Sequence, residues 1–105
     1  MTIGTHWHII PLMITYDWNR EKNQLLISTR GVSFEEVVVL LENGNILDVI
    51  EHPNQAQYSH QKMYILEIKD YVYLVPFVEE KNKIFLKTII PSRKAKKEYH
   101  GNQER

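Results

Sequence analysis

Residues 29–37, with the sequence TRGVSFEEV, contain the signals that end one helix and begin the next. Gly31 is placed to follow the last turn of the first helix, because glycine adopts the left-handed conformation of that position at little cost. Ser33 and Glu36 form the S-x-x-E pattern of a capping box, in which each side chain accepts a hydrogen bond from the backbone N–H of the other residue. A valine on each side of the box adds a hydrophobic staple. The stretch predicts two short helices joined by a tight link, a helical hairpin.

The limits of the two helices are predicted from the residues on either side. The first helix is expected at residues 18–28, capped by Asp17, after a short strand at residues 14–16. The second helix is expected to run to about Glu42, where an Asn-Gly pair stops it.

The residues after this pair are predicted to be extended. Strands are expected at residues 46–50, 62–69, 71–79 and 83–90. In the third of these strands apolar residues fall on both faces, so both faces of the sheet are expected to be covered. Pro76 indicates an edge or a bulge in it. Pro91 ends the last strand, and Ser92 can cap a closing helix from Arg93 to about Tyr99.

This order of elements predicts an α+β fold. Helices that precede a run of hairpin-linked strands typically cover one face of an antiparallel sheet. The expected architecture is a helical hairpin packed on a small antiparallel sheet of about four strands, with a short C-terminal helix. The chain lacks both internal repeats and the strand–helix alternation of a doubly wound fold.

The chain has 105 residues, of which 43% are hydrophobic, and this supports one modest core. We expect a peripheral N-terminal extension at residues 1–12, one domain at residues 13–100 and a polar tail at residues 101–105. The absence of cysteine excludes disulfides and a thiol nucleophile. No apolar stretch is long enough to cross a bilayer, and no basic segment precedes the apolar residues near the N-terminus, so a cytoplasmic protein is expected.

The formal charges cancel over the whole chain but not along it. Thirteen Lys and Arg residues balance thirteen Asp and Glu residues. Residues 1–80 carry five cations and eleven acids, whereas residues 81–105 carry eight cations and two acids, so the net charges of the two parts are −6 and +6. Such asymmetry is typical of an interaction surface, although a solvated terminal helix or tail would show the same composition.

The basic segment at residues 87–97 is the main candidate for a functional site. Its cations are Lys87, Arg93, Lys94, Lys96 and Lys97. In a helix that begins at Arg93, two of the lysines fall within one turn of this arginine, and Lys94 lies about 100° round the axis. Lys87, in the preceding strand, would lie near the same rim. Such cations suit phosphate groups, which an arginine grips through paired hydrogen bonds and a helix N-terminus attracts.

Metal-dependent and acyl-transfer chemistry have little support in the sequence. Their motifs are absent, the five histidines are scattered, and the pair His6 and His8 lacks a third ligand. We therefore expect neither a metal nor a cofactor. RNA is cleaved without a metal when a base activates the 2′-hydroxyl and cations stabilise the transition state. The candidate proton carriers near the basic segment are Glu98, His100, Glu67 and His52.

Each of these features also has an interpretation without chemistry. A basic cluster can be a plain binding surface. Four tyrosines could stack on single-stranded bases, but tyrosines on strands more often line walls and cores. These are Tyr64, Tyr71, Tyr73 and Tyr99. Glu35 and Glu36 are interpreted as residues of the capping turn that point different ways, not as an acid pair.

Three stretches of the chain resemble the BrnT family of bacterial type II toxins. They are residues 16–23 (YDWNREKN), 30–37 (RGVSFEEV) and 89–96 (IIPSRKAK), the last followed by Glu98 and Tyr99. The resemblance covers nearly all of residues 14–99. It implies a RelE-like fold and RNA cleavage that arrests translation, with or without the ribosome. It also implies neutralisation by a small DNA-binding antitoxin that mediates repression of the operon.

The resemblance also implies roles for single residues. Arg93 matches the arginine of the family's terminal block and is expected to contact phosphate or the transition state. Lys94 matches the basic residue that follows, Lys22 the first-helix lysine, and Glu98 the later acid. The family usually shows Lys-His-Gly where this chain has Thr-Arg-Gly at residues 29–31, so a histidine that could carry a proton or contact a base is missing here.

Two hypotheses follow. The leading one is a toxin that cleaves RNA with Arg93, Glu98 and Lys94 as its catalytic group. Its RNA-binding residues would be Lys22, Lys87, Lys96, Lys97 and Tyr99. The expected partners are a cognate antitoxin and RNA, with operon DNA bound only through the antitoxin and no membrane. The competing hypothesis is a non-catalytic module whose basic C-terminal face docks an acidic partner or nucleic acid.

Overall fold

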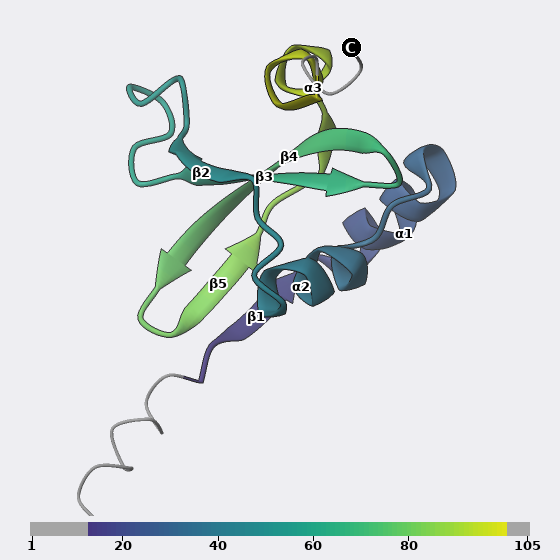
Figure 1. The fold of residues 1–105 in the computed structure, drawn as a ribbon. Coiled ribbons are helices and arrows are strands. Elements are labelled where there is room, and N and C mark those ends of the chain that lie inside the picture. The colour runs from purple at the N-terminus through teal and green to yellow at the C-terminus, as the bar shows by residue number, and fades with distance from the viewer. Residues whose placement is uncertain (1–12, 101–105) are drawn as a thin grey trace, which may run out of the picture.

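The computed structural model describes residues 13–100, apart from the side chain of His100, and shows a mixed sheet with helices on both sides (Figure 1). The strands are β1 (Thr15–Trp18), β2 (Asp48–Glu51), β3 (Lys62–Ile68), β4 (Tyr71–Glu80), β5 (Lys83–Leu86) and β6 (Ile90–Pro91). The helices are α1 (Arg20–Arg30), α2 (Phe34–Glu42) and α3 (Arg93–His100). The α+β class is confirmed. The extension and the tail predicted at the two ends, and the His6–His8 pair, lie outside the described residues.

The first helix begins later than predicted. Asn19 caps α1, and its side chain accepts a hydrogen bond from the N–H of Lys22 at 2.9 Å. Asp17, the expected cap, lies in β1, where its carboxylate accepts from the N–H of Trp18. The ring of Trp18 stacks on Phe34 with centroids 5.6 Å apart. This contact with the core extends the strand beyond the predicted boundary, because burial of an aromatic ring outweighs a weak helical preference.

The link between α1 and α2 has the predicted form. Gly31 has a φ of 69°, and its N–H donates to the carbonyl four residues back at 3.1 Å. Ser33 and Glu36 make both hydrogen bonds of the capping box. Val32 and Val37 are buried, as the hydrophobic staple requires. The second helix ends at Glu42, as predicted, with a glycine of positive φ two residues later.

The sheet is not the four-stranded antiparallel meander that the sequence predicts. Within residues 13–100 it has six strands, in the order β1-β5-β4-β3-β2, with β6 pairing with β4. β1 lies parallel to β5, with Tyr16 opposite Ile84 and Trp18 opposite Leu86, so the sheet is mixed. Two helices separate β1 from the other strands along the chain. Its place in the sheet is therefore set by packing of Tyr16 and Trp18 against the core, which local sequence patterns do not report.

The strand predicted at residues 83–90 is divided in two. β5 pairs with the second half of β4, and β6 pairs with Tyr73 and Leu74 in its first half. Pro76 lies between these two ladders and has no N–H to donate. Its carbonyl accepts a hydrogen bond from the N–H of Lys87 at 2.8 Å. The irregularity predicted at Pro76 is the point at which the strand that pairs with this side of β4 changes from β6 to β5.

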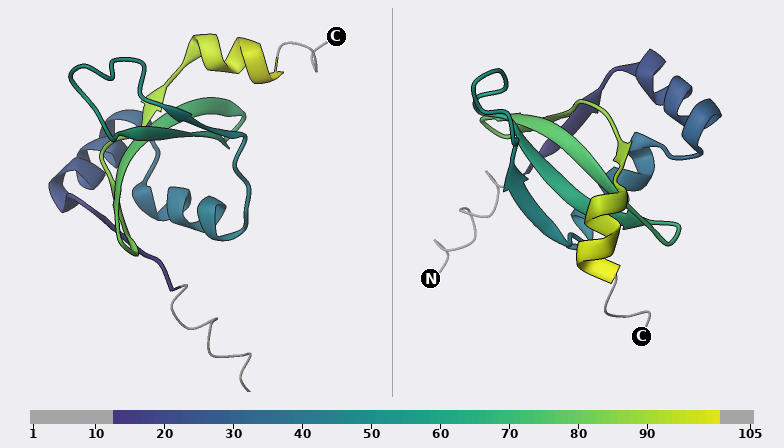
Figure 2. Two further views of the ribbon diagram at one scale, coloured as in Figure 1. Left: turned by 90° about the vertical axis from the view of Figure 1, so that its left-hand side faces the viewer. Right: turned by 90° about the horizontal axis from the view of Figure 1, so that it is seen from above.

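The helices cover both faces of the sheet, not one face as predicted. α1 and α2 pack on one face through Leu26, Phe34 and Val37, which meet Leu66 and Val75 in the larger core. Figure 2 shows α3 on the opposite side of the sheet from α2. The alternation of apolar residues in β4 correctly predicted two covered faces, but the expectation that the helices share one face was wrong.

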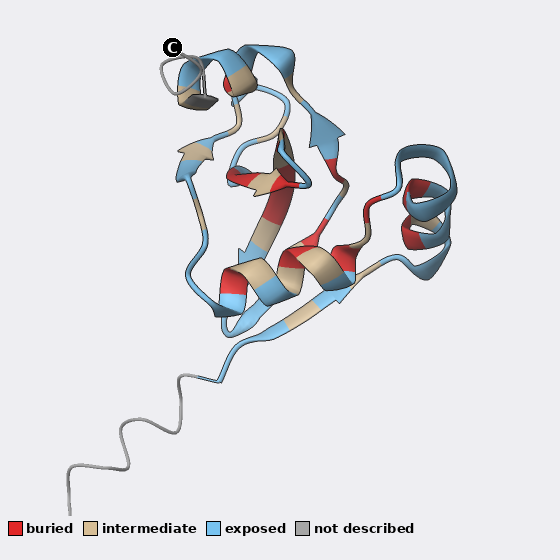
Figure 3. Cartoon of the chain, turned by 45° about the vertical axis from the view of Figure 1, so that its right-hand side comes forward, coloured by how far each residue is buried: buried red, intermediate tan, exposed pale blue. Residues whose placement is uncertain are grey.

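A smaller core lies under α3. It joins Ala95 of this helix to Ile65 and Val72 of the sheet, with Tyr99 packed at its edge. A single alanine is the only fully packed side chain that the described part of α3 contributes. The helix is therefore held by a small apolar contact and by its polar bonds, and Figure 3 shows most of it exposed.

Candidate nucleic-acid interface

The N-terminus of α3 is fixed by Ser92, as the sequence predicts. The N–H of Ser92 donates to the carbonyl of Val72 at 3.0 Å, which ties this residue to the sheet. Its hydroxyl accepts from the N–H of Ala95 at 3.1 Å, and its carbonyl accepts from the N–H of Lys96 at 3.0 Å. The first turn of α3 is thus positioned on the rigid part of the fold.

The cations of α3 are directed mainly away from the sheet. Ala95 and Tyr99 face the smaller core, and with 100° per residue this leaves Arg93, Lys94 and Lys97 on the outer side, where all three are exposed. Lys96 is half-buried at the flank, with its Nζ 5.8 Å from the ring centroid of a tyrosine in β4. We call Arg93, Lys94 and Lys97 the outer basic face.

The outer basic face is electrostatically unfavourable for the helix itself. Arg93 lies four residues before Lys97, and Lys94 lies three residues before it, so like charges are neighbours on the helix surface. The first turn contains no acid, although an acid there would favour the helix dipole. Each effect costs a few tenths of a kcal/mol. Within residues 13–100 no hydrogen bond or ion pair neutralises these three side chains. An anionic ligand would relieve both effects at once.

The proton carriers proposed from the sequence come from three parts of the fold. Glu98 is exposed on α3, one turn after Lys94. His52 lies in the loop after β2, where its ring stacks on Tyr58 at 4.3 Å and its Nδ1 accepts from the N–H of Asn54. Glu67 is half-buried in β3, and the side chain of His100 lies outside the described residues.

The tyrosines fall into two groups. Tyr64 is buried and stacks on Phe77 with centroids 4.0 Å apart, which confirms it as a core residue. Burial raises the pKa of its phenol to about 12, with a smaller effect from the phenol of Tyr16 and the carboxylate of Glu79. Tyr71 and Tyr73 meet edge to face at 5.7 Å and are half-exposed on β4, so their rings line its surface.

Lys87 and Lys22 do not belong to α3. Lys87 is exposed after β5, with its Nζ 5.6 Å from the ring centroid of Phe85. Lys22 lies in α1, on the other side of the sheet from α3. The structure therefore brings together Arg93, Lys94, Lys96, Lys97, Glu98 and Tyr99 on one helix, but not Lys22.

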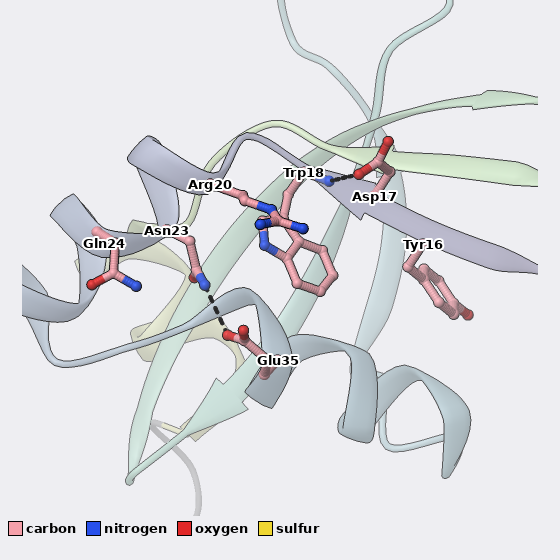
Figure 4. Close-up of a pocket in the computed structure, with 7 residues that line it drawn as sticks. All are labelled: Tyr16, Asp17, Trp18, Arg20, Asn23, Gln24 and Glu35. Carbon is pink, nitrogen blue, oxygen red and sulfur yellow. Dashed lines mark hydrogen bonds between the residues drawn. The ribbon is translucent and has the colours of Figure 1, made fainter.

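A cleft that the sequence did not predict lies at the start of α1 (Figure 4). Its volume is about 490 Å³. It is lined by Tyr16, Asp17, Trp18, Arg20, Asn23, Gln24 and Glu35. The sequence signal that could have indicated it is the alternation Tyr-Asp-Trp at residues 16–18, which puts two aromatic rings on one face of a strand just before a helix carrying polar side chains.

Glu35 is held in this cleft by a buried amide. Asn23 is 3% exposed, and its Oδ1 accepts from the N–H of Phe34 at 2.8 Å while its Nδ2 donates to Oε1 of Glu35 at 2.8 Å. The hydrogen bond from Asn23, followed by one from a backbone N–H, lowers the pKa of Glu35. Glu36, by contrast, bonds Ser33, so the two glutamates act separately, as predicted.

Within residues 13–100 no three His, Cys, Asp or Glu side chains gather into a group that could hold a metal ion. None of the helices in this part of the chain is long and apolar enough to cross a bilayer. Comparisons with protein-family models, with curated proteins and with solved structures find no match to the chain. The resemblance to the BrnT toxins therefore stays a prediction that rests on the quoted residues.

Proposed function

We propose that the chain is the toxin of a type II toxin–antitoxin system and cleaves RNA without a metal. The observation that carries this proposal is the outer basic face, whose three cations lack partners within residues 13–100 and disfavour their own helix. It lies within the terminal block that resembles the BrnT family. The family would give the chain a RelE-like fold.

In the proposed reaction the 2′-hydroxyl of a ribose attacks the adjacent phosphorus. Glu98 takes the proton of this hydroxyl, the bond to the 5′-oxygen of the next nucleotide breaks, and that oxygen leaves with a proton from solvent. The products are a 2′,3′-cyclic phosphate and a free 5′-hydroxyl. Arg93 and Lys94 stabilise the charge that develops on the phosphoryl oxygens. Lys96, Lys97 and Tyr99 bind RNA beside them, and Lys87 and Lys22 contact it farther away.

A cognate antitoxin would act on the same helix. Acidic side chains placed over Arg93 and Lys97 would neutralise them and exclude RNA, because both partners require the same cations. This part of the proposal includes a cytoplasmic location, repression of the operon through the DNA-binding antitoxin, and action on RNA with or without the ribosome.

The second candidate is a binding module without catalysis. It is favoured by the position of Glu98, which is exposed at a flank of α3 and makes no hydrogen bond within residues 13–100. General bases are usually fixed by neighbouring groups, whereas a binding face needs only exposed cations. This module predicts binding to RNA or an acidic partner that weakens with salt, with no turnover.

Expression in bacteria with and without the antitoxin tests the toxin. Growth arrest is expected for the wild type and for Lys62→Ala, which removes an exposed cation of β3, and loss of arrest is expected for Arg93→Ala. Arg93→Lys keeps the positive charge but loses the planar guanidinium group. Growth arrest weaker than that of the wild type but stronger than that of Arg93→Ala would indicate that the arginine makes paired hydrogen bonds.

Purified protein and a labelled RNA separate the two candidates. Cleavage should leave a cyclic phosphate and should persist in a chelator. Salt-sensitive binding with intact RNA would establish the module and contradict the toxin. Circular dichroism of each variant checks that the loss of function is not a loss of folding.

A further inference from the structure

The cleft at the start of α1 combines the groups that recognise a nucleobase. Tyr16 and Trp18 lie two residues apart in β1 and project from the same face of this strand, and both are half-exposed. Arg20 is exposed at one side of the cleft, Gln24 lies beyond it on α1, and Glu35 comes from α2 (Figure 4). A volume of about 490 Å³ is within the range of small-ligand sites and accommodates a purine with its ribose.

We propose that this cleft binds a guanine base, with an aromatic side chain stacked on its ring and Glu35 accepting from its N1–H and N2–H groups. Arg20 would donate to O6 or N7 of the same base, which is a common way for arginine to read guanine. The inference rests on the proposed function for the source of the base, which is a single-stranded RNA, but the cleft itself does not depend on α3.

The aromatic wall is rigid on one side. The ring of Trp18 stacks on Phe34, which is fully buried, so the indole is held by the larger core and does not need to be ordered by a ligand. Figure 4 shows Trp18, Arg20 and Glu35 among the side chains that line the cleft. Stacking of a base on such a ring contributes to binding for every base, and selectivity must come from the polar groups.

The carboxylate of Glu35 is fixed as an acceptor. Its Oε1 receives the 2.8 Å hydrogen bond from Asn23, which is buried and holds the backbone of α2 with its other end. A carboxylate has about four acceptor positions, so it can accept from a ligand as well. The lowered pKa of Glu35 keeps it charged at neutral and weakly acidic pH.

The charges of the cleft select guanine over other ligands. A phosphate would meet the carboxylates of Glu35 and Asp17, and the ammonium or guanidinium group of a partner protein would meet Arg20. Guanine presents two adjacent donors to an acceptor-only carboxylate and two acceptors on another edge to a donor-only guanidinium. Adenine has no pair of adjacent donors on one edge and would leave the carboxylate partly unpaired.

Tryptophan fluorescence measures this binding directly. The chain has two tryptophans, so the Trp7→Phe variant leaves Trp18 as the reporter. Guanosine monophosphate should quench its emission in a saturable way, and adenosine monophosphate should bind about tenfold more weakly or worse. Glu35→Gln should weaken binding of guanosine monophosphate about tenfold. The control Glu21→Gln removes the same charge from an exposed position of α1 outside the cleft and should have no effect.

Short single-stranded oligonucleotides separate the two sources of the base. An RNA with one guanine in a run of uridines should bind more tightly than the free nucleotide because its flanking phosphates can contact cations outside the cleft. The advantage of the guanine over an all-uridine strand should vanish in Glu35→Gln. Equal binding of the nucleotide and the guanine-containing strand would identify a free nucleotide as the ligand while leaving the cleft a guanine site.

Two results would overturn the inference. One is the absence of any quenching of Trp18 by guanine ligands at millimolar concentration, and the other is equal affinity for guanine and adenine in the wild type. If RNA is still cleaved and growth still arrested under those conditions, the guanine site is wrong and the toxin stands. If guanine binds while no RNA is cleaved, the guanine site stands and the proposed toxin activity is wrong.

Discussion

The phenol of Tyr99 in α3 donates a hydrogen bond to Oδ2 of Asp48 in β2 across 2.8 Å. The contact joins the last turn of the helix that carries the outer basic face to an edge strand of the sheet. Ser92 fixes the first turn of the same helix. Between these two points the buried contribution of α3 is Ala95, so the polar bonds at its ends determine how firmly the cations are held.

Tyr99→Phe should loosen the end of α3 without unfolding the protein. The bond lies at the surface, so its loss should cost less than about 1 kcal/mol of global stability. Amide exchange of the last turn of α3 should accelerate, while exchange near Ala95 changes little. In an Asp48→Ala background the same substitution should have no further effect, and an effect of full size there would show that the ring and not the hydrogen bond matters.

Asn23→Ala should be among the more destabilising substitutions of a polar residue in the chain. It leaves the N–H of Phe34 without its acceptor at the start of α2 and frees Glu35. The cost of an unsatisfied buried N–H is roughly 1–3 kcal/mol, which urea unfolding can measure. Gln24→Ala, one residue away and exposed, is the control and should change stability by under about 0.5 kcal/mol.

Asn23→Asp gives the same position a charge test. The new carboxylate can still accept a hydrogen bond from the N–H of Phe34, but it repels the carboxylate of Glu35. The pKa of the new carboxyl group is therefore raised in the folded state, and its protonation favours folding. The loss of stability relative to the wild type should therefore be larger at pH 7 than at pH 4. A pH-independent difference would show that the loss of the amide donor, not the repulsion, dominates.

Stability above pH 10 should depend on Tyr64. Its pKa of about 12 in the folded protein exceeds the ordinary value of 10.0, because burial disfavours the phenolate. The unfolded chain then loses this proton first, so the contribution of Tyr64 is complete below pH 10 and is lost as the pH rises to about 12. The loss is up to about 1.4 kcal/mol per pH unit. Tyr64→Phe should flatten this part of the stability profile measured by urea unfolding, whereas Tyr58→Phe in the loop after β2 should not.

Local signals predicted the parts of the fold that local interactions determine. The capping box of Ser33 and Glu36, the left-handed Gly31 and the cap at Ser92 each satisfy backbone groups within a few residues, so the sequence nearby is sufficient. The strands predicted at residues 62–69 and 71–79 are likewise separated where expected, by a turn in which Lys69 and Asp70 both have positive φ.

The errors concern contacts between distant residues. Trp18 was predicted in a helix, yet it lies in a strand because it stacks on Phe34 and pairs with Leu86, which is 68 positions later in the sequence. The parallel pairing of β1 and the cleft were missed for the same reason, because both depend on contacts between distant residues. The cleft combines side chains of β1, the start of α1 and the start of α2. The position of α3 on the second face depends on which face of β4 remains uncovered, and no pattern within residues 93–99 reports it.

Arg93→Glu should stabilise the protein and abolish its proposed activity. A glutamate at the first position of α3 interacts favourably with the helix dipole and lies four residues before Lys97, which is the favourable order for an ion pair. Together these effects should raise stability by roughly 0.5–1 kcal/mol. RNA binding should fall, and the salt dependence of the remaining binding should be shallower because fewer counterions are released.

The control for Arg93→Glu is Lys62→Glu, which changes the net charge by the same amount in β3, far from α3 in the sequence. It should leave the salt dependence of RNA binding nearly unchanged. The combination of higher stability with lost binding for Arg93→Glu is expected when a charge is kept for a ligand at the expense of the fold. Lower stability for Arg93→Glu would contradict the account of the outer basic face, since the arginine would then be holding the helix in place.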